Sequence, residues 1–229
     1  GEMAQATAWE TQCEKMRWAF RKYHVAQSQG LLPLHVTDMY DPQDSSTGKG
    51  YSQAGQTVAI TAGLLTPQEA RADLEYAFPA PFGSPPQEVT RWNNPTYCLR
   101  ALSALSCAGM SQRAVAHLIE RYSQYLPKHP ANPIPEELQG AYGGPLPEYW
   151  ISREDWGCAP GEIDPAQPVD DTGSHGWGSV PLLWLHEYLL GVTICQPGGG
   201  KLRIAPETGG LPYVCGHTCT PRGKVWVSW

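Results

Sequence analysis

Apolar side chains recur at steps of three and four residues through much of the first half of the chain. This is the spacing of one face of an α-helix. The first such stripe, within residues 7–27, consists of Trp9, Cys13, Met16, Phe20 and Tyr23. The stripe predicts an amphipathic helix near the start of the chain.

Four shorter helices are predicted downstream, in two pairs with short connections. The first pair spans 52–64 and 66–78, and the second spans 94–108 and 111–122. Thr66 and Glu69, with Pro67 between them, form the pattern of a capping box, and Ser111 is the predicted cap of the last helix. These patterns predict antiparallel helical hairpins joined by tight turns.

The second half is organised around the segment 169–190, which changes from a polar turn into an apolar helix at Pro181. Ser179 is the predicted cap of that helix. Residues 127–168 are rich in Pro and Gly and show no sustained period. Short alternating runs at 201–205, 212–215 and 224–229 then predict strands, with a turn at 221–223.

The order of these elements gives the fold class and the domain boundaries. We expect a mainly α protein, in which helical hairpins are followed by a short antiparallel β region. Residues 1–190 would form the helical domain and residues 191–229 the small C-terminal β region.

Charge and hydropathy exclude two classes of partner. The 229 residues carry a formal net charge of −6, which argues against nucleic acid as a partner. No apolar run approaches the roughly 20 residues of a membrane-spanning helix, and no signal-peptide pattern opens the chain. We therefore expect a soluble cytoplasmic protein without a leader and without a membrane partner.

The seven cysteines favour reduced thiols, because their number is odd and several lie within apolar helical patterns. Cys215, His217 and Cys219 suggest zinc, but the Cys-x-His-x-Cys spacing suits a tetrahedral site poorly and no second ligand pair is nearby. We expect a strand there, and neither a metal nor a cofactor in the protein.

The aromatic residues are skewed towards those with a polar group. The chain has nine Trp and eleven Tyr but only three Phe. Trp and Tyr often line wet pockets and interfaces. This bias favours a concave site for a small-molecule ligand.

Two long runs carry a resemblance to a known family. SHGWGSVPLLWLHEYLLGV, followed by QPGGGKLRIAPETGGLPYVCGHTCTPRGKVWVSW, resembles the end of bacterial and fungal α-L-rhamnosidases of the six-hairpin glycosidase class. The resemblance covers about sixty residues and includes the His-Gly-Trp turn, the Ile-x-Pro and the final Thr-Pro-x-Gly pattern. SQAGQTVAITAGLL resembles a helix of the same family.

The resemblance implies an (α/α)6 toroid around an aromatic sugar pocket, and an inverting glycoside hydrolysis by two carboxyl groups. The position that matches the family's general base is Glu148, although Pro147 stands where the family usually has Trp. The family's Asp-Gln-Arg acid loop and roughly half of its hairpins have no counterpart in this sequence. The implied fold is therefore a partial toroid.

Three acidic residues are candidates for acid/base catalysis. Glu148 lies near Tyr142 and Trp150, where partial burial would raise its pKa, or it is a solvated loop carboxylate. Asp170 and Asp171 would supply the missing acid or bind the substrate, or they form an ordinary Asx turn. Of these two, Asp171 is our candidate acid and Asp170 our candidate substrate contact.

Histidine and tryptophan residues complete the predicted site. His175 would orient a substrate hydroxyl or transfer a proton, or it ties the loop to a backbone carbonyl. Stacking on a ring is predicted for Trp92, Trp150, Trp156 and Trp177, with core packing as the alternative. Core packing is what we expect for Trp184 and Trp229.

Three functions follow from these candidates. The first is hydrolysis of an α-L-rhamnoside-like glycoside. The second is a non-hydrolytic acid/base reaction on a small, apolar metabolite in biosynthesis, and the third is a binding module without chemistry. A partial toroid would also expose an apolar flank, so we expect a homodimer with two-fold symmetry.

Overall fold

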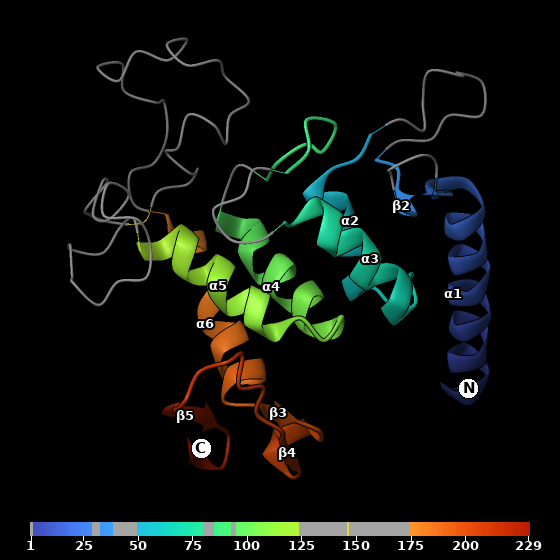
Figure 1. Ribbon diagram of the computed structural model, residues 1–229. Coiled ribbons are helices and arrows are strands. Elements are labelled where there is room, and N and C mark those ends of the chain that lie inside the picture. Colours follow the sequence, from blue (N-terminus) through green and yellow to red (C-terminus); the bar gives the residue numbers. More distant parts are fainter. Residues whose placement is uncertain are drawn as a thin grey trace.

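The computed structural model describes residues 2–28, 33–38, 50–79, 85–92, 95–123, 146 and 175–229. In these parts the protein is mainly helical, and short antiparallel strand pairs follow the helices, as the sequence predicts (Figure 1). Figure 1 shows α2 to α5 grouped together, with α1 at one side of the group and the C-terminal strands beyond α6.

The first predicted hairpin is formed by α2 (Gln53–Thr61) and α3 (Pro67–Ala77). The Ser52 side chain caps α2 by accepting a hydrogen bond from the Gly55 backbone N–H. The predicted capping box at α3 is confirmed: the Thr66 hydroxyl accepts from the Glu69 N–H, and the Glu69 carboxylate accepts from the Thr66 N–H. These bonds satisfy backbone donors that a helix start leaves unpaired.

The second hairpin is formed by α4 (Cys98–Cys107) and α5 (Ser111–Tyr122), and the short helix η1 (Pro95–Tyr97) precedes it. Gly109 has a φ of 71° in the tight turn between the two helices, a conformation that glycine adopts without steric cost. The predicted Ser111 cap is wrong, because Met110 occupies the cap position without a side-chain bond. The Ser111 hydroxyl instead donates to Glu207 in the C-terminal segment.

The core lies between these hairpins and α6 (Pro181–Trp184). Leu74, Leu102 and Leu105 are fully buried there. Trp184 is also fully buried, and its indole N–H donates to Ser106 Oγ at 3.1 Å. The expected core role of Trp184 is therefore confirmed.

The helix predicted after Pro181 is α6 continued by η6 (Leu185–Leu189), which is a π-helical turn. The predicted Ser179 cap is wrong. Ser179 lies in the preceding 3-10 turn η5 (Gly176–Ser179), and its hydroxyl donates to the Gly176 carbonyl at 2.8 Å.

The C-terminal region contains two antiparallel strand pairs among its described residues. β3 (Val192–Ile194) pairs with β4 (Leu202–Ile204), and β5 (Cys215–Thr220) pairs with β6 (Gly223–Ser228). The strands predicted at 201–205 and 224–229 are confirmed. The predicted strand at 212–215 is wrong except for its last residue, and β3 was not predicted.

This β region is attached to the helices by specific bonds. The Trp229 indole N–H donates to the Leu189 carbonyl at 3.0 Å, and the Glu207 N–H donates to the Tyr188 carbonyl at 2.9 Å. Trp229 also packs against the core, as expected. The division of the chain at residue 190 into two domains stays a prediction.

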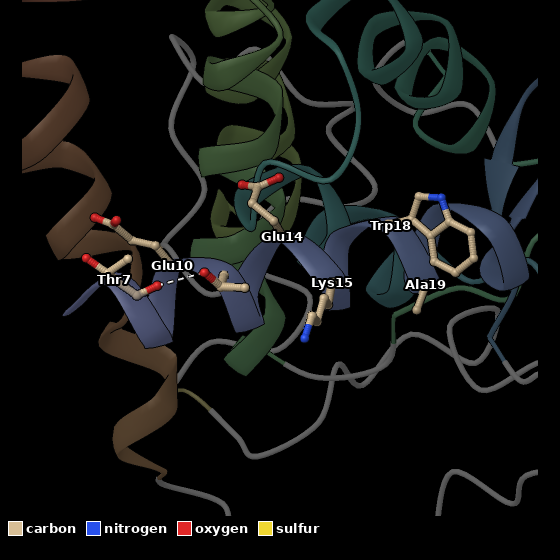
Figure 2. Close-up of a pocket in the computed structure, with 7 residues that line it drawn as sticks. Thr7, Glu10, Glu14, Lys15, Trp18 and Ala19 are labelled. Atoms are coloured by element: carbon tan, nitrogen blue, oxygen red, sulfur yellow. Dashed lines mark hydrogen bonds between the residues drawn. The ribbon is translucent and has the colours of Figure 1, made fainter. Parts of the chain in front are cut away.

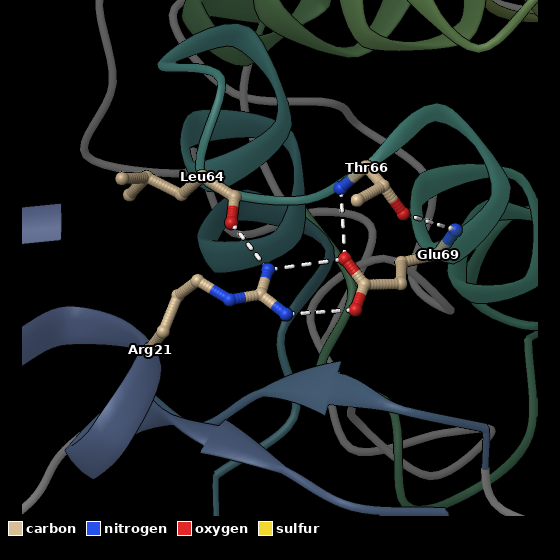
Figure 3. A network of polar contacts seen from close by, with 4 residues as sticks. All are labelled: Arg21, Leu64, Thr66 and Glu69. Carbon is tan, nitrogen blue, oxygen red and sulfur yellow. Dashed lines mark hydrogen bonds and ion pairs between the residues drawn. The ribbon is translucent and has the colours of Figure 1, made fainter. Parts of the chain in front are cut away.

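The helix predicted at the start of the chain is α1 (Glu2–His24), which is followed by the strand pair β1 (Val25–Ala26) and β2 (His35–Val36). None of its residues is buried. Phe20 packs on the edge of the core, and Arg21 binds Glu69 and the Leu64 carbonyl (Figure 3). The helix is therefore attached to the hairpins near its C-terminal end.

Candidate functional site

Six of the predicted site residues lie outside the described parts of the chain. They are Tyr142, Glu148, Trp150, Trp156, Asp170 and Asp171. His175, Trp177 and Trp92 are described. The candidate site is therefore built here from the His-Gly-Trp turn and the helix ends around it.

The turn is fixed by backbone bonds at both of its ends. The His175 N–H donates to the Leu146 carbonyl at 2.8 Å, and the Gly178 N–H donates to the His175 carbonyl at 3.0 Å. The Tyr122 hydroxyl, at the end of α5, donates to the Gly178 carbonyl at 2.9 Å. The turn is thus held against the second hairpin.

Gly178 permits this close packing because it has no side chain. It is buried, and a Cβ atom added there would lie 2.4 Å from Cβ of Leu146. No Cβ atom tolerates that distance, so any larger residue would displace the turn. The second glycine of Gly-Trp-Gly is therefore a packing requirement.

The two side chains of the turn form an aromatic pair. The rings of His175 and Trp177 are 4.3 Å apart at an interplanar angle of 67°, which is an edge-to-face contact. The imidazole is half-buried, whereas 43 % of Trp177 is exposed. The structure thus presents an indole ring held by its neighbour and open to solvent, which suits stacking on the apolar face of a ring.

Trp92 lies in the core, with only 3 % of its surface exposed. Its ring meets Phe78 edge-to-face at 6.0 Å, and the Arg121 guanidinium lies 5.6 Å from the ring centroid. Its backbone N–H donates to the Gln53 side chain at 3.1 Å. This environment matches core packing, which was the alternative for Trp92. Any contact of Trp92 with a substrate stays a prediction.

Two residues at the end of α5 were missed as candidates, one beside Trp92 and one beside the turn. Arg121 contacts Trp92, and Tyr122 holds the turn. Tyr122 is the last residue of the predicted helix 111–122, and no periodic signal distinguishes Arg121. Neighbouring Cys98 is fully buried, and burial raises the pKa of its thiol to about 12, so it is protonated and unsuited to act as a nucleophile.

A buried polar group that was not predicted from the sequence lies in the first hairpin. The Tyr51 hydroxyl donates to Asp73 Oδ1 at 2.5 Å, while Asp73 Oδ2 has no hydrogen-bond partner. Burial raises the pKa of Asp73 to about 7, against the opposing effect of the Tyr51 bond. A pKa near 7 suits a general acid, but this carboxyl group is fully buried.

The Cys215, His217 and Cys219 motif lies on one side of β5, where the strand is paired with β6. His217 packs against Trp226, with ring centroids 4.5 Å apart. Within the described residues no three metal-ligating side chains gather into a possible ion site. The described cysteines are free thiols.

A hollow on α1 is lined by one helix alone, as Figure 2 shows. Its seven residues include Glu10, Glu14, Lys15 and Trp18, and all of them belong to the same exposed helix. A ligand there would contact a single side of the helix and would remain in solvent. This hollow is therefore not a candidate for the catalytic site.

None of the helices within the described ranges combines the length and apolar character that crossing a lipid bilayer demands. No protein-family model matches the sequence, and no curated protein does either.

Comparison with solved structures shows the fold. The chain resembles a GH78 family rhamnosidase of Bacillus sp. GL1, with a TM-score of 0.58 and 20 % sequence identity over 85 % of this chain. The match covers only 18 % of the rhamnosidase chain. The described structure therefore has the fold of a helical stretch of a glycosidase.

Proposed function

We propose that this chain is a glycosidase-like acid/base enzyme whose substrate ring stacks on Trp177. Hydrolysis of an α-L-rhamnoside-like glycoside is the reaction that its residues suit best. The observation that carries the proposal is the partly exposed Trp177 ring, which contacts His175 in a turn that Tyr122 and backbone bonds hold in place, within a glycosidase-like fold.

The described residues would bind and orient the sugar. The C–H face of a pyranose ring is apolar and matches the exposed face of Trp177. His175, beside it, can exchange a hydrogen bond with a hydroxyl at the ring edge. Because the turn is bound to α5, both groups would keep their positions while the substrate enters.

The acid/base roles are carried by residues proposed from the sequence. Glu148 would take a proton from water as that water attacks the anomeric carbon. Asp171, aided by Asp170, would protonate the oxygen of the departing group, and the C–O bond would break towards it. The products are the free sugar and the alcohol, with inverted configuration at the anomeric carbon.

Release of nitrophenol from an aryl α-L-rhamnoside tests the hydrolysis. We expect measurable turnover, and a loss of about 10²- to 10⁴-fold in kcat for Glu148→Gln. NMR of the first product formed would show the inverted anomer. A chain that binds rhamnose but releases no nitrophenol would favour the non-hydrolytic enzyme or the binding module.

Calorimetric titration with rhamnose tests the stacking role separately. We expect Trp177→Ala to weaken binding by about tenfold or more, which is 1.4 kcal/mol or more. Trp226→Ala is the matched control, because Trp226 is also exposed and also contacts a histidine, but lies on the distant β6. Equal losses in the two variants would contradict a site at Trp177.

A further inference from the structure

We infer that α1 is a docking helix for a second copy of this chain, and that two α1 helices pair in antiparallel orientation. The inference concerns a surface away from the proposed catalytic turn and does not depend on it.

The apolar stripe of α1 continues beyond the point where the helix is attached. Phe20 packs on the edge of the core, but Met16 and Trp9, one and three turns earlier, are 62 % and 63 % exposed. Cys13, between them, is also exposed. A contiguous apolar stripe of this kind is the usual mark of an interaction surface.

The spacing of the stripe is that of a coiled-coil seam. Trp9, Cys13, Met16, Phe20 and Tyr23 follow one another at steps of four, three, four and three residues. Ala6 extends the same series by three residues towards the start of the helix. A regular alternation of three and four places apolar residues at the a and d positions of a heptad.

Charges beside the seam specify the partner and its direction. Glu10 and Arg17 each follow a d residue directly and are seven residues apart, so both lie on the same flank of the seam. In a parallel pair, each would face a residue at a g position of the other copy, Gln5 or Gln12, and neither of these carries a charge. In an antiparallel pair, Glu10 of each copy faces Arg17 of the other, which creates two identical ion pairs about a two-fold axis.

The same charges select one register. Pairing Cys13 with Met16 of the second copy brings Glu10 level with Arg17. Shifting the helices by one heptad would instead place Glu10 opposite Glu10. Charge complementarity therefore favours a second copy in one orientation and one register.

Charge exchange tests this pairing, with sedimentation velocity as the measurement. We expect the wild-type chain to dimerise at tens of micromolar. Glu10→Arg and Arg17→Glu should each weaken dimerisation by about tenfold or more, because each variant places like charges on both sides of the axis. An equimolar mixture of the two variants should restore the wild-type affinity, because opposite charges then face each other again.

Two further variants complete the test. Lys15→Glu makes the same charge change as Arg17→Glu but lies away from the seam, and it should leave dimerisation unchanged. Trp9→Ala should weaken dimerisation without any change of charge. Far-UV circular dichroism identifies any variant in which the helix itself is lost.

Three results would overturn the inference. The first is a wild-type monomer at concentrations up to about 100 µM. The second is a dimer with unchanged affinity in both charge variants, which would assign association to another surface. The third is a mixture that associates no better than either variant alone, which would exclude the antiparallel pairing.

Discussion

Helices α4 and α1 both carry an apolar stripe, but only α4 is buried. Leu102 and Leu105 of α4 have no exposed surface, whereas α1 contains no buried residue at all. The shorter helix, with 10 residues against 23, therefore contributes far more to the core. An apolar stripe predicts a helix and the face it offers, but burial depends on partners brought from elsewhere in the chain.

The difference arises from what surrounds each helix. Helix α4 packs against α2, α5 and α6, and the Trp184 indole of α6 donates a hydrogen bond to Ser106 of α4. α1 is attached by Phe20 and Arg21 near its end. Stability should therefore reside in the hairpins, and α1 should behave as an appendage.

The strongest test of this contrast is Leu102→Ala. Removing a fully buried leucine leaves a cavity, so we expect the free energy of unfolding to fall by about 2–5 kcal/mol. Met16→Ala on α1 is the control, and at low micromolar concentration it should cost no more than about 0.5 kcal/mol. Urea denaturation followed by circular dichroism measures both, and similar costs would mean that α1 is as well packed as α4.

The second test uses the buried carboxyl group of Asp73. Its pKa is about 7 in the folded protein, while an unfolded aspartate titrates near 4. Between these two pH values folded Asp73 keeps a proton that the unfolded aspartate has released. The free energy of unfolding should therefore fall as the pH rises from about 4 to about 7, and then level off. The upper limit of this slope is about 1.4 kcal/mol per pH unit.

Asp73→Asn should remove that slope, because the amide has no proton to release in this range. Urea midpoints measured from pH 4.5 to 8 for both proteins give the difference directly. Glu75→Gln is the control, since Glu75 lies on the same helix α3 in an exposed pair with Arg71. An unchanged slope in Asp73→Asn would show that other groups cause the pH dependence.

Local signals in the sequence succeeded where a few neighbouring residues decide the structure. The capping box at Thr66 and Glu69 is complete within four residues, and the turn at 221–223 closes its own hairpin. The resemblance to rhamnosidases also predicted the helical glycosidase-like fold, which the comparison with the solved rhamnosidase structure supports. In each case the evidence lay in contiguous residues.

One error occurred where a distant residue competes for the same group. Ser111 can cap α5, but it pairs with Glu207, ninety-six residues later in the chain. At the candidate site, the sequence predicts His175 and Trp177, but the bond from Tyr122 that holds their turn depends on the tertiary fold.

The third test addresses the cap of α3. Thr66→Ala removes the hydroxyl that accepts from the Glu69 N–H, so we expect a loss of about 1 kcal/mol in unfolding free energy. Thr11→Ala is the matched control on α1, where the threonine is exposed within the helix and bonds only to the Thr7 carbonyl. That change should be neutral or slightly stabilising, because alanine is the better helix former.

The smallest expected effect tests the link between α1 and the hairpins. Arg21 bonds lower the pKa of Glu69 to about 2, so their contribution is present above about pH 4.5 and is lost as the pH falls towards 2. Arg21→Gln should therefore raise the pKa of Glu69 in an NMR titration. Because the pair is partly exposed, global stability should fall by less than about 1 kcal/mol.

Hydrogen exchange of the same variant separates local from global effects. If Arg21 holds only α1, amide protection should fall in the last turns of α1 while α4 keeps its wild-type protection. Arg71→Gln, which breaks another exposed pair on α3, should change neither helix. Loss of protection throughout α4 would show that α1 is part of the cooperative core, and the contrast between the two helices would then fail.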